Sequence, residues 1–185
     1  AVLTGSYAFR NNASILPGSA PLLIRPSTPT LPAMFQKNGD HTAVIGKWHL
    51  GLGDGTPAWN DQLSPGPLEI GFNYAFIVPA TLDRVPTVFV ENHQVVGLEK
   101  SDTLSISYDH KVGNLPTGLE HPEMTTMPAD SQHSGTIIDS ISRIGFMTGG
   151  RAAWWKDEDI TSTVVGKVKN YIHQNKQHPF FLYFA

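Results

Sequence analysis

The chain has 185 residues, of which 40% are hydrophobic and 16% charged, and its net charge at pH 7 is −3. A chain of this length can bury a sizeable core, and this composition is ordinary for a globular protein. The sequence has no cluster of basic residues, which argues against a nucleic-acid partner. It also has no apolar run long enough to cross a membrane.

The beginning of the chain carries no recognisable targeting segment. It has neither an initiator Met nor the basic and apolar regions of an export signal, so we expect it to start inside a longer protein. Asn12, Ala13 and Ser14 fit the N-glycosylation sequon, a short pattern that often arises by chance. The absence of cysteine excludes disulfides and thiolate metal sites from this stretch.

The first regular elements are a helix and a strand. Apolar residues recur at helical spacing in residues 28–38, which predicts a helix with Ser27 or Thr28 as its N-cap and Gly39 as its stop. The apolar, β-branched run of residues 41–46 follows at once and predicts a buried parallel strand. A helix followed directly by a buried strand indicates an α/β sheet.

The middle of the chain predicts two further strands. They cover residues 73–78 and 87–91. Asn92 and His93 are expected to turn the second strand back through residues 94–97 as a hairpin, although this turn lacks the usual glycine.

The clearest amphipathic helix lies near the end of the chain. Acidic residues 157–159 fall in its first turn, lysines follow later, and apolar residues recur in steps of four at Ile160, Val164, Val168 and Ile172. Residues 179–184 are apolar without a break, which predicts a strand covered on both faces. In parallel sheets catalytic groups lie in loops beyond the carboxyl ends of strands.

Lys47 and His49 stand two residues apart at the end of the first predicted strand. An extended backbone would point both side chains to the same side, on one wall of a polar cleft. An ammonium can hold a sulfate or phosphate oxygen, and an imidazole can donate a hydrogen bond or move a proton. Spacing alone favours a simpler interpretation, with Lys47 solvated, Trp48 packed and His49 satisfied in the core.

Eight segments resemble the sulfatase family, in the same order and at similar separations. They include Gly-Lys-Trp-His-Leu-Gly and Pro-Phe-Phe-Leu-Tyr-Phe-Ala. Residues 98–132 match poorly, and Ser6 stands where many relatives have Arg. The matching segments are residues 3–5, 30–43, 46–51, 64–67, 71–74, 83–92, 143–147 and 179–185.

The resemblance implies an alkaline-phosphatase-like α/β fold, with a mostly parallel sheet flanked by helices. It also implies a calcium ion and a formylglycine made from Cys or Ser, both held by parts of the catalytic domain that precede or follow residues 1–185. We therefore expect the chain to be incomplete at both ends, to supply no metal ligand, and to be inactive in isolation.

Site residues also follow from the resemblance. Lys47 matches a lysine that contacts the sulfate, and His49 matches a histidine that hydrogen-bonds the formylglycine hydrate and accepts its proton. Thr81 aligns with a hydroxyl residue that lines the pocket, with an ordinary loop hydroxyl as the alternative. His133 is expected either to reach the leaving group of the substrate or to be an exposed loop histidine. Asp83 and Arg84 are secondary candidates that could instead form a structural ion pair.

The function implied is hydrolysis of the sulfate ester of a sulfated small molecule or glycan, either aryl or carbohydrate. A phosphoester or phosphonate hydrolase of the same superfamily is the first alternative, because an anion clamp and a metal do not separate sulfate from phosphate. A non-catalytic fragment is the second. The family expectation for location is the periplasm or the cell exterior.

Overall fold

The computed structural model describes residues 1–11 and 15–185, so the sequon at Asn12 lies outside the described residues. Its main feature is a five-stranded sheet in the order β4-β3-β2-β1-β9. The strands are β1 (His41–Lys47), β2 (Tyr74–Val78), β3 (Val90–Glu91), β4 (Gln94–Val95) and β9 (Phe180–Phe184). The predicted α/β fold is confirmed, and the sheet is mixed because the β3-β4 hairpin adds two antiparallel pairs to the parallel strands β2, β1 and β9.

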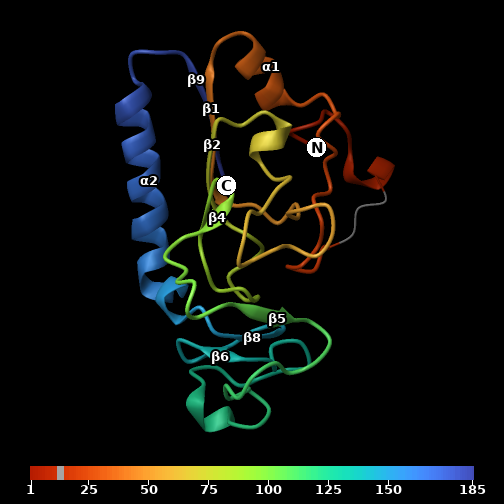
Figure 1. Cartoon of the computed structure of the whole chain (residues 1–185), viewed down its shortest axis with the longest axis vertical. Coiled ribbons are helices and arrows are strands. Elements are labelled where there is room, and N and C mark those ends of the chain that lie inside the picture. The colour runs from red at the N-terminus through yellow and green to blue at the C-terminus, as the bar shows by residue number, and fades with distance from the viewer. Residues whose placement is uncertain (12–14) are drawn as a thin grey trace.

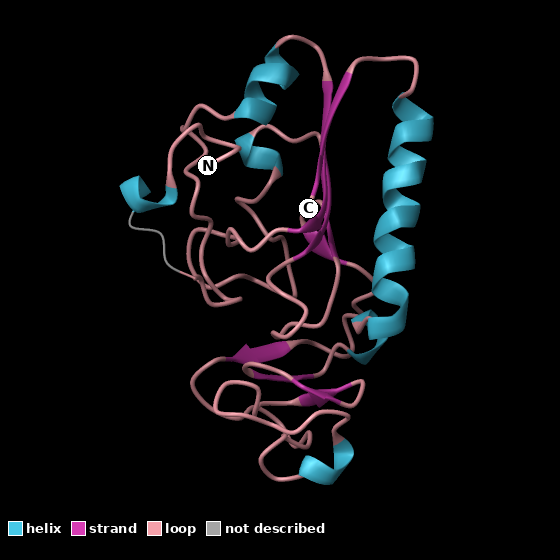
Figure 2. Ribbon diagram, turned by 180° about the vertical axis from the view of Figure 1, so that it is seen from behind, coloured by secondary structure: helices cyan, strands magenta, loops and turns pink. Residues whose placement is uncertain are grey.

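Helices cover both faces of this sheet. Figures 1 and 2 show α2 (Ile160–Asn175) along one face and α1 (Leu31–Lys37) with the N-terminal region on the other. Strand β1 alternates accordingly, because Ala43 and Ile45 pack in the cluster with α2 whereas Val44 packs in the cluster on the opposite side. Residues 42–46 are all buried, as the apolar run predicted.

Helix α1 begins two residues later than predicted. Thr30 is its N-cap, and the Thr30 hydroxyl accepts a hydrogen bond from the Ala33 N–H at 3.2 Å and donates one to the Ile70 carbonyl. The predicted cap at Ser27 or Thr28 is wrong, because Thr28 closes a turn with its N–H on the Arg25 carbonyl.

The predicted hairpin after β2 is confirmed in a shorter form. Asn92 adopts a left-handed φ of 55°, which asparagine tolerates better than most residues. The Asn92 side chain also accepts a hydrogen bond from the Ala75 N–H, at 3.1 Å. This contact fastens the turn to β2. The left-handed backbone of Asn92 takes the place of the usual turn glycine.

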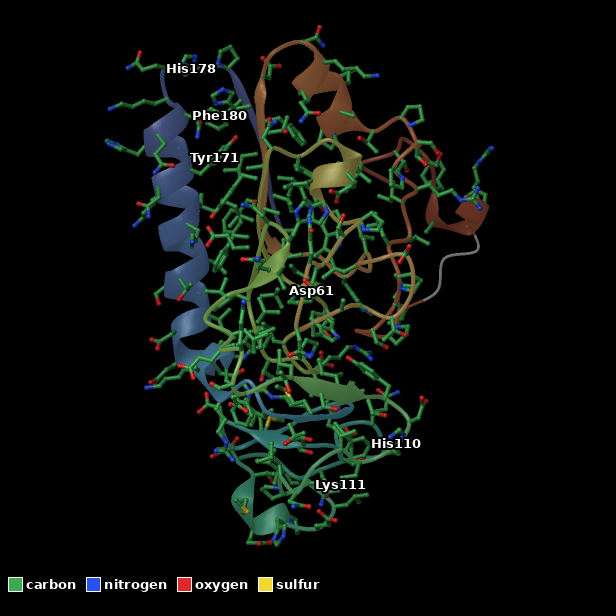
Figure 3. The ribbon with its side chains drawn as sticks, viewed as in Figure 1. Asp61, His110, Lys111, Tyr171, His178 and Phe180 are labelled. Carbon is green, nitrogen blue, oxygen red and sulfur yellow. The ribbon has the colours of Figure 1, made fainter. Side chains whose placement is uncertain are left out.

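Helix α2 confirms the predicted amphipathic helix with two changes. The acidic residues expected in its first turn form the separate 3-10 helix η5 (Asp157–Asp159) before it, and one apolar position differs. Ile160 and Val164 are buried, but Ile172 is 42% exposed and Tyr171 takes its place in the core. Steps of four overshoot the 3.6-residue period, so after three steps the apolar stripe has moved back by one residue. Tyr171 packs edge-on against Phe180, with ring centroids 5.7 Å apart. Figure 3 shows both residues at the end of the molecule far from His110.

Strand β9 forms where predicted, but it is only half-buried. It pairs with β1 alone and is an edge strand of the described sheet. One face packs well, because the Phe181 ring stacks on Phe35 at 4.9 Å and on Phe72 at 6.3 Å. Phe184 remains 54% exposed, so the prediction of cover on both faces is wrong for this chain.

The four remaining strands do not belong to the five-stranded sheet. Residues 98–155, here called the lobe, hold two small antiparallel sheets that the sequence did not predict, and Figure 1 shows the lobe below the end of the main sheet. No described helix is long and apolar enough to cross a membrane. The lobe strands are β5 (Ser105–Ser107), β6 (Ile137–Ile138), β7 (Ile141–Ser142) and β8 (Phe146–Thr148). The 3-10 helices are η1 (Ala8–Asn11), η2 (Leu68–Ile70), η3 (Pro122–Met124), η4 (Arg151–Ala153) and η5 (Asp157–Asp159).

Candidate active site

The candidate active site lies where β1 and β2 end. Because these strands are parallel, their carboxyl ends meet at one edge of the sheet, the usual place for catalytic groups in α/β folds. Lys47 is the last residue of β1, and residues 79–86, here called the 79–86 loop, leave β2 beside it. Figure 1 shows this edge facing the lobe, so loops from both regions build the site.

Lys47 is exposed and lines a cavity of about 450 Å³ together with Thr81. Within the described residues Lys47 forms no ion pair, so its charge is available to an anion. The cavity differs from the expected polar cleft because most of its wall is apolar and comes from β2, α2 and β9. The apolar lining residues are Val78, Leu82, Ile160, Val164, Val165, Phe184 and Ala185.

His49 lies just beyond β1 but does not line the cavity of Lys47. Its backbone adopts a left-handed φ of 52°, which ends the strand alternation that was expected to place the two side chains on one side. His49 Nε2 lies 2.7 Å from the Leu16 carbonyl oxygen, and Trp48 between the two residues is buried. The roles of Lys47 and His49 stay predictions, with Lys47 beside α2 and His49 directed at Leu16.

The hydrogen bond of His49 fixes which ring nitrogen carries the proton. A carbonyl oxygen only accepts hydrogen bonds, so Nε2 must be the protonated nitrogen that donates to Leu16. In the neutral ring this leaves the Nδ1 lone pair as the acceptor. His49 is therefore set up to take a proton at Nδ1.

The 79–86 loop brings Asp83 into contact with His133. Nε2 of His133 lies 3.2 Å from Asp83 Oδ2. Burial alone would raise the pKa of Asp83, but the hydrogen bond with His133 and the charge of Arg84 lower it below its ordinary value. Asp83 is therefore a carboxylate at neutral pH.

His133 is held from both sides. Its Nδ1 lies 2.9 Å from Asp130 Oδ2, while its Nε2 faces Asp83. The hydrogen bond to Asp130, and secondarily the one to Asp83, raise the pKa of the His133 imidazole despite partial burial, and the contacts with His133 lower the pKa of Asp130 to about 2. With both ring nitrogens engaged, His133 ties the lobe to the 79–86 loop, and its predicted contact with a leaving group stays a prediction.

Arg84 does not form the ion pair with Asp83 that was considered as its structural role. No such pair occurs among the ion pairs of the described residues, because Asp83 turns to His133 instead. The charge of Arg84 acts at longer range on the pKa values of Asp83 and Tyr108. Arg84 Nε is buried without a hydrogen-bond partner in the part of the chain that the structure describes.

Two residues that support this site were not identified from the sequence. Burial raises the pKa of Tyr108 to about 12, and its hydroxyl donates a hydrogen bond to the Val85 carbonyl. Arg143 is 1% exposed and pairs with Asp157. Neither belongs to a motif with a chemical signature, and only the match of residues 143–147 to sulfatases pointed near Arg143.

The described residues include no group of three or more His, Cys, Asp or Glu side chains that could hold a metal ion. Calcium requires six to eight oxygen ligands. The carboxylates of residues 1–11 and 15–185 therefore do not fit a calcium site by themselves, and no chemical step is assigned to a metal below.

Comparison with known proteins gives close matches. No protein-family model matches the chain. It is 48% identical over 184 residues to an N-acetylgalactosamine-6-O-sulfatase of Bacteroides thetaiotaomicron, a match that covers 98% of this chain and 36% of that protein. The chain thus spans about a third of the length of this curated relative.

Solved structures show the same relationship. A structure concerned with the metabolism of multiple glycosaminoglycans by B. thetaiotaomicron superposes with a TM-score of 0.96 at 48% identity, covering 99% of this chain and 38% of that one. A sulfatase from Pseudoalteromonas sp. shares the fold, with a TM-score of 0.50 at 16% identity, covering 99% of this chain and 32% of that one. Over nearly its whole length this chain is therefore similar in sequence and in fold to part of a sulfatase, which confirms the resemblance to the sulfatase family.

Proposed function

We propose that the protein containing this chain hydrolyses the sulfate ester of a sulfated glycan, with 6-O-sulfated N-acetylgalactosamine as the substrate unit. The observation that carries the proposal is the 48% identity over 184 residues to an enzyme of that name. The match includes the carboxyl ends of β1 and β2, where the candidate site lies. A substrate of this kind accords with an exported protein, periplasmic or extracellular.

The residues of this chain have separate tasks in the proposed reaction. Lys47 contributes a compact positive charge, without a carboxylate partner among the described residues, that stabilises the sulfuryl oxygens. His49 keeps its ring proton on Nε2, where it donates to the Leu16 carbonyl, and accepts a proton at Nδ1. Thr81 lines the same cavity as Lys47. The formylglycine and calcium that the family resemblance implies would be held by residues other than 1–185, where the formylglycine would supply the nucleophile and the calcium a positive charge.

The apolar cavity wall also bears on the chemistry. A charge beside apolar surface is less screened than one surrounded by water, so each contact of Lys47 with an anion is stronger there. The same wall suits a sulfate monoester, which carries one charge, better than a phosphate monoester, which carries about −1.5 to −2 at neutral pH. This difference supports the sulfatase over the phosphatase alternative.

The direct test is release of the inorganic anion from matched substrates by the whole protein. N-acetylgalactosamine 6-sulfate, its 4-sulfate isomer and N-acetylgalactosamine 6-phosphate are compared, with sulfate and phosphate measured by ion chromatography. We expect kcat/KM for the 6-sulfate to exceed the other two by about a hundredfold or more. Preference for the phosphate would establish the phosphoester hydrolase instead, and release of neither anion by pure, folded protein would favour a non-catalytic role.

A further inference from the structure

Arg143 is the largest fully buried side chain that the described part of the chain contains, and the candidate chemistry does not use it. It follows β7 in the lobe, yet its guanidinium reaches three different segments. It donates to the Leu82 carbonyl in the 79–86 loop and to the Ile138 carbonyl at 3.0 Å in the lobe. It also pairs with both carboxylate oxygens of Asp157, just before α2.

The contact at Leu82 falls between two candidate site residues. Thr81 lines the cavity of Lys47, and Asp83 binds His133. The backbone next to Arg143 reinforces the contact, because the Ile144 N–H donates to the Asp83 carbonyl at 2.8 Å. Arg143 thus lies where the lobe and the 79–86 loop are joined, directly behind the residues that face the site.

Stability alone is a poor reason for an arginine at this place. A buried ion pair is often no more stable than apolar side chains of similar volume, because both charges lose their hydration. Arg143 also keeps its Nε–H buried without a partner within the described residues, a further cost. An apolar side chain could not donate hydrogen bonds to the carbonyls of Leu82 and Ile138. These two hydrogen bonds fix the 79–86 loop relative to the lobe.

We propose that Arg143 is a positioning residue, which holds the 79–86 loop so that Thr81 and Asp83 meet the sulfated sugar in the binding geometry. The inference rests on the proposed function for the identity of the substrate. It assigns the lobe a role in substrate binding through a buried support, with Asp157 fixing the orientation of the guanidinium.

The test uses variants of the whole protein that separate positioning from stability. Arg143→Lys keeps the charge but loses the fork that bridges Leu82 and Asp157. The double variant Arg143→Met with Asp157→Leu removes the loop anchor without leaving an unpaired charge, so it is expected to stay folded. Lys167→Met is the matched control, because it breaks the 2.7 Å pair with Glu91 and touches neither the loop nor the lobe.

Both Arg143 variants are expected to raise KM for N-acetylgalactosamine 6-sulfate by about tenfold or more while kcat changes by less than about threefold. Amide exchange of residues 82–84 is expected to speed up by about tenfold while exchange in β1 is unchanged. The control should leave both readouts at the wild-type level.

A double variant with wild-type KM and wild-type exchange at residues 82–84 would overturn the inference, as would equal effects in the Lys167→Met control. If the wild-type protein releases no sulfate, the proposed function fails. The exchange measurement then still decides whether Arg143 holds the loop.

Discussion

The main sheet and the lobe are stabilised in different ways. In the sheet, β1 and β2 bury apolar side chains on both faces, with Ile45 and Ile77 fully inaccessible. In the lobe, strands of two or three residues are joined by polar contacts such as Thr136 with Met147, and the pair of Arg143 with Asp157 ties the lobe to the start of α2. The sheet supplies the edge at which the candidate site lies, and the lobe supplies loops around it. Binding specificity commonly resides in loops carried by such a scaffold.

The largest effect should come from a cavity in the sheet. Ile45→Ala is expected to lower the free energy of unfolding by about 2–5 kcal/mol, because Ile45 is fully buried between β2 and α2. Leu119→Ala in the lobe, where the side chain is 75% exposed, should change it by less than about 0.5 kcal/mol. Denaturant unfolding of the whole protein measures both. Similar losses from the two variants would contradict the attribution of the stability at Ile45 to apolar burial in the sheet.

A polar contact inside the lobe should matter less than apolar burial in the sheet, but measurably. The Thr136 hydroxyl accepts a hydrogen bond from the Met147 N–H at 3.0 Å, and Thr136 is 1% exposed. Thr136→Val keeps the shape and leaves this buried N–H without a partner, so a loss of about 1–3 kcal/mol is expected. Thr136→Ser, which keeps the hydroxyl, is the control in the same unfolding experiment. An unchanged stability in the valine variant would mean that polar contacts do not hold the lobe.

The smallest effect is a pH dependence at the join between the lobe and the 79–86 loop. The raised pKa of His133 makes its contribution to stability complete below the unfolded imidazole value and lost as the pH rises through the folded value. The lowered pKa values of Asp83 and Asp130 make their contribution complete above the unfolded carboxyl values and lost as the pH falls. The join is therefore strongest in mildly acidic solution.

Raising the pH through the raised pKa of His133 should slightly lower the protection of the amides of residues 130–133, measured as the exchange rate relative to that of an unfolded peptide at the same pH, because the imidazole loses its charge. The effect is small because the His133 side chain is 36% exposed to solvent. His133→Gln should abolish the pH dependence while keeping a hydrogen-bonding side chain. The same slope in wild type and variant would place the titrating group elsewhere.

The same contrast explains what the sequence predicted. β1 is a continuous apolar run and α2 shows strong periodicity over sixteen residues, and both were found with nearly correct bounds. The lobe strands are too short for any period to register, since β6 and β7 have two residues each. The pairing of β5 with β8 also joins residues distant in the chain, such as Ser105 with Thr148.

The sequence named candidate site residues whose roles stay predictions, and it predicted their geometry only in part. Lys47 and Thr81 were identified and do line one cavity. The orientation of His49 did not follow from strand alternation because its left-handed backbone breaks the pattern. The role of Arg143 required the fold, because its partners Leu82 and Asp157 lie 61 and 14 residues away.

The most direct test of the central claim is the charge of Lys47 in the whole protein. We expect Lys47→Ala to lower kcat/KM for N-acetylgalactosamine 6-sulfate by about a hundredfold or more, as for other losses of charge stabilisation at a reacting group. Lys100→Ala, which removes an exposed lysine of the lobe, is the matched control and should stay within about twofold of wild type. Wild-type turnover in Lys47→Ala would contradict the assignment of this edge of the sheet as the sulfate site.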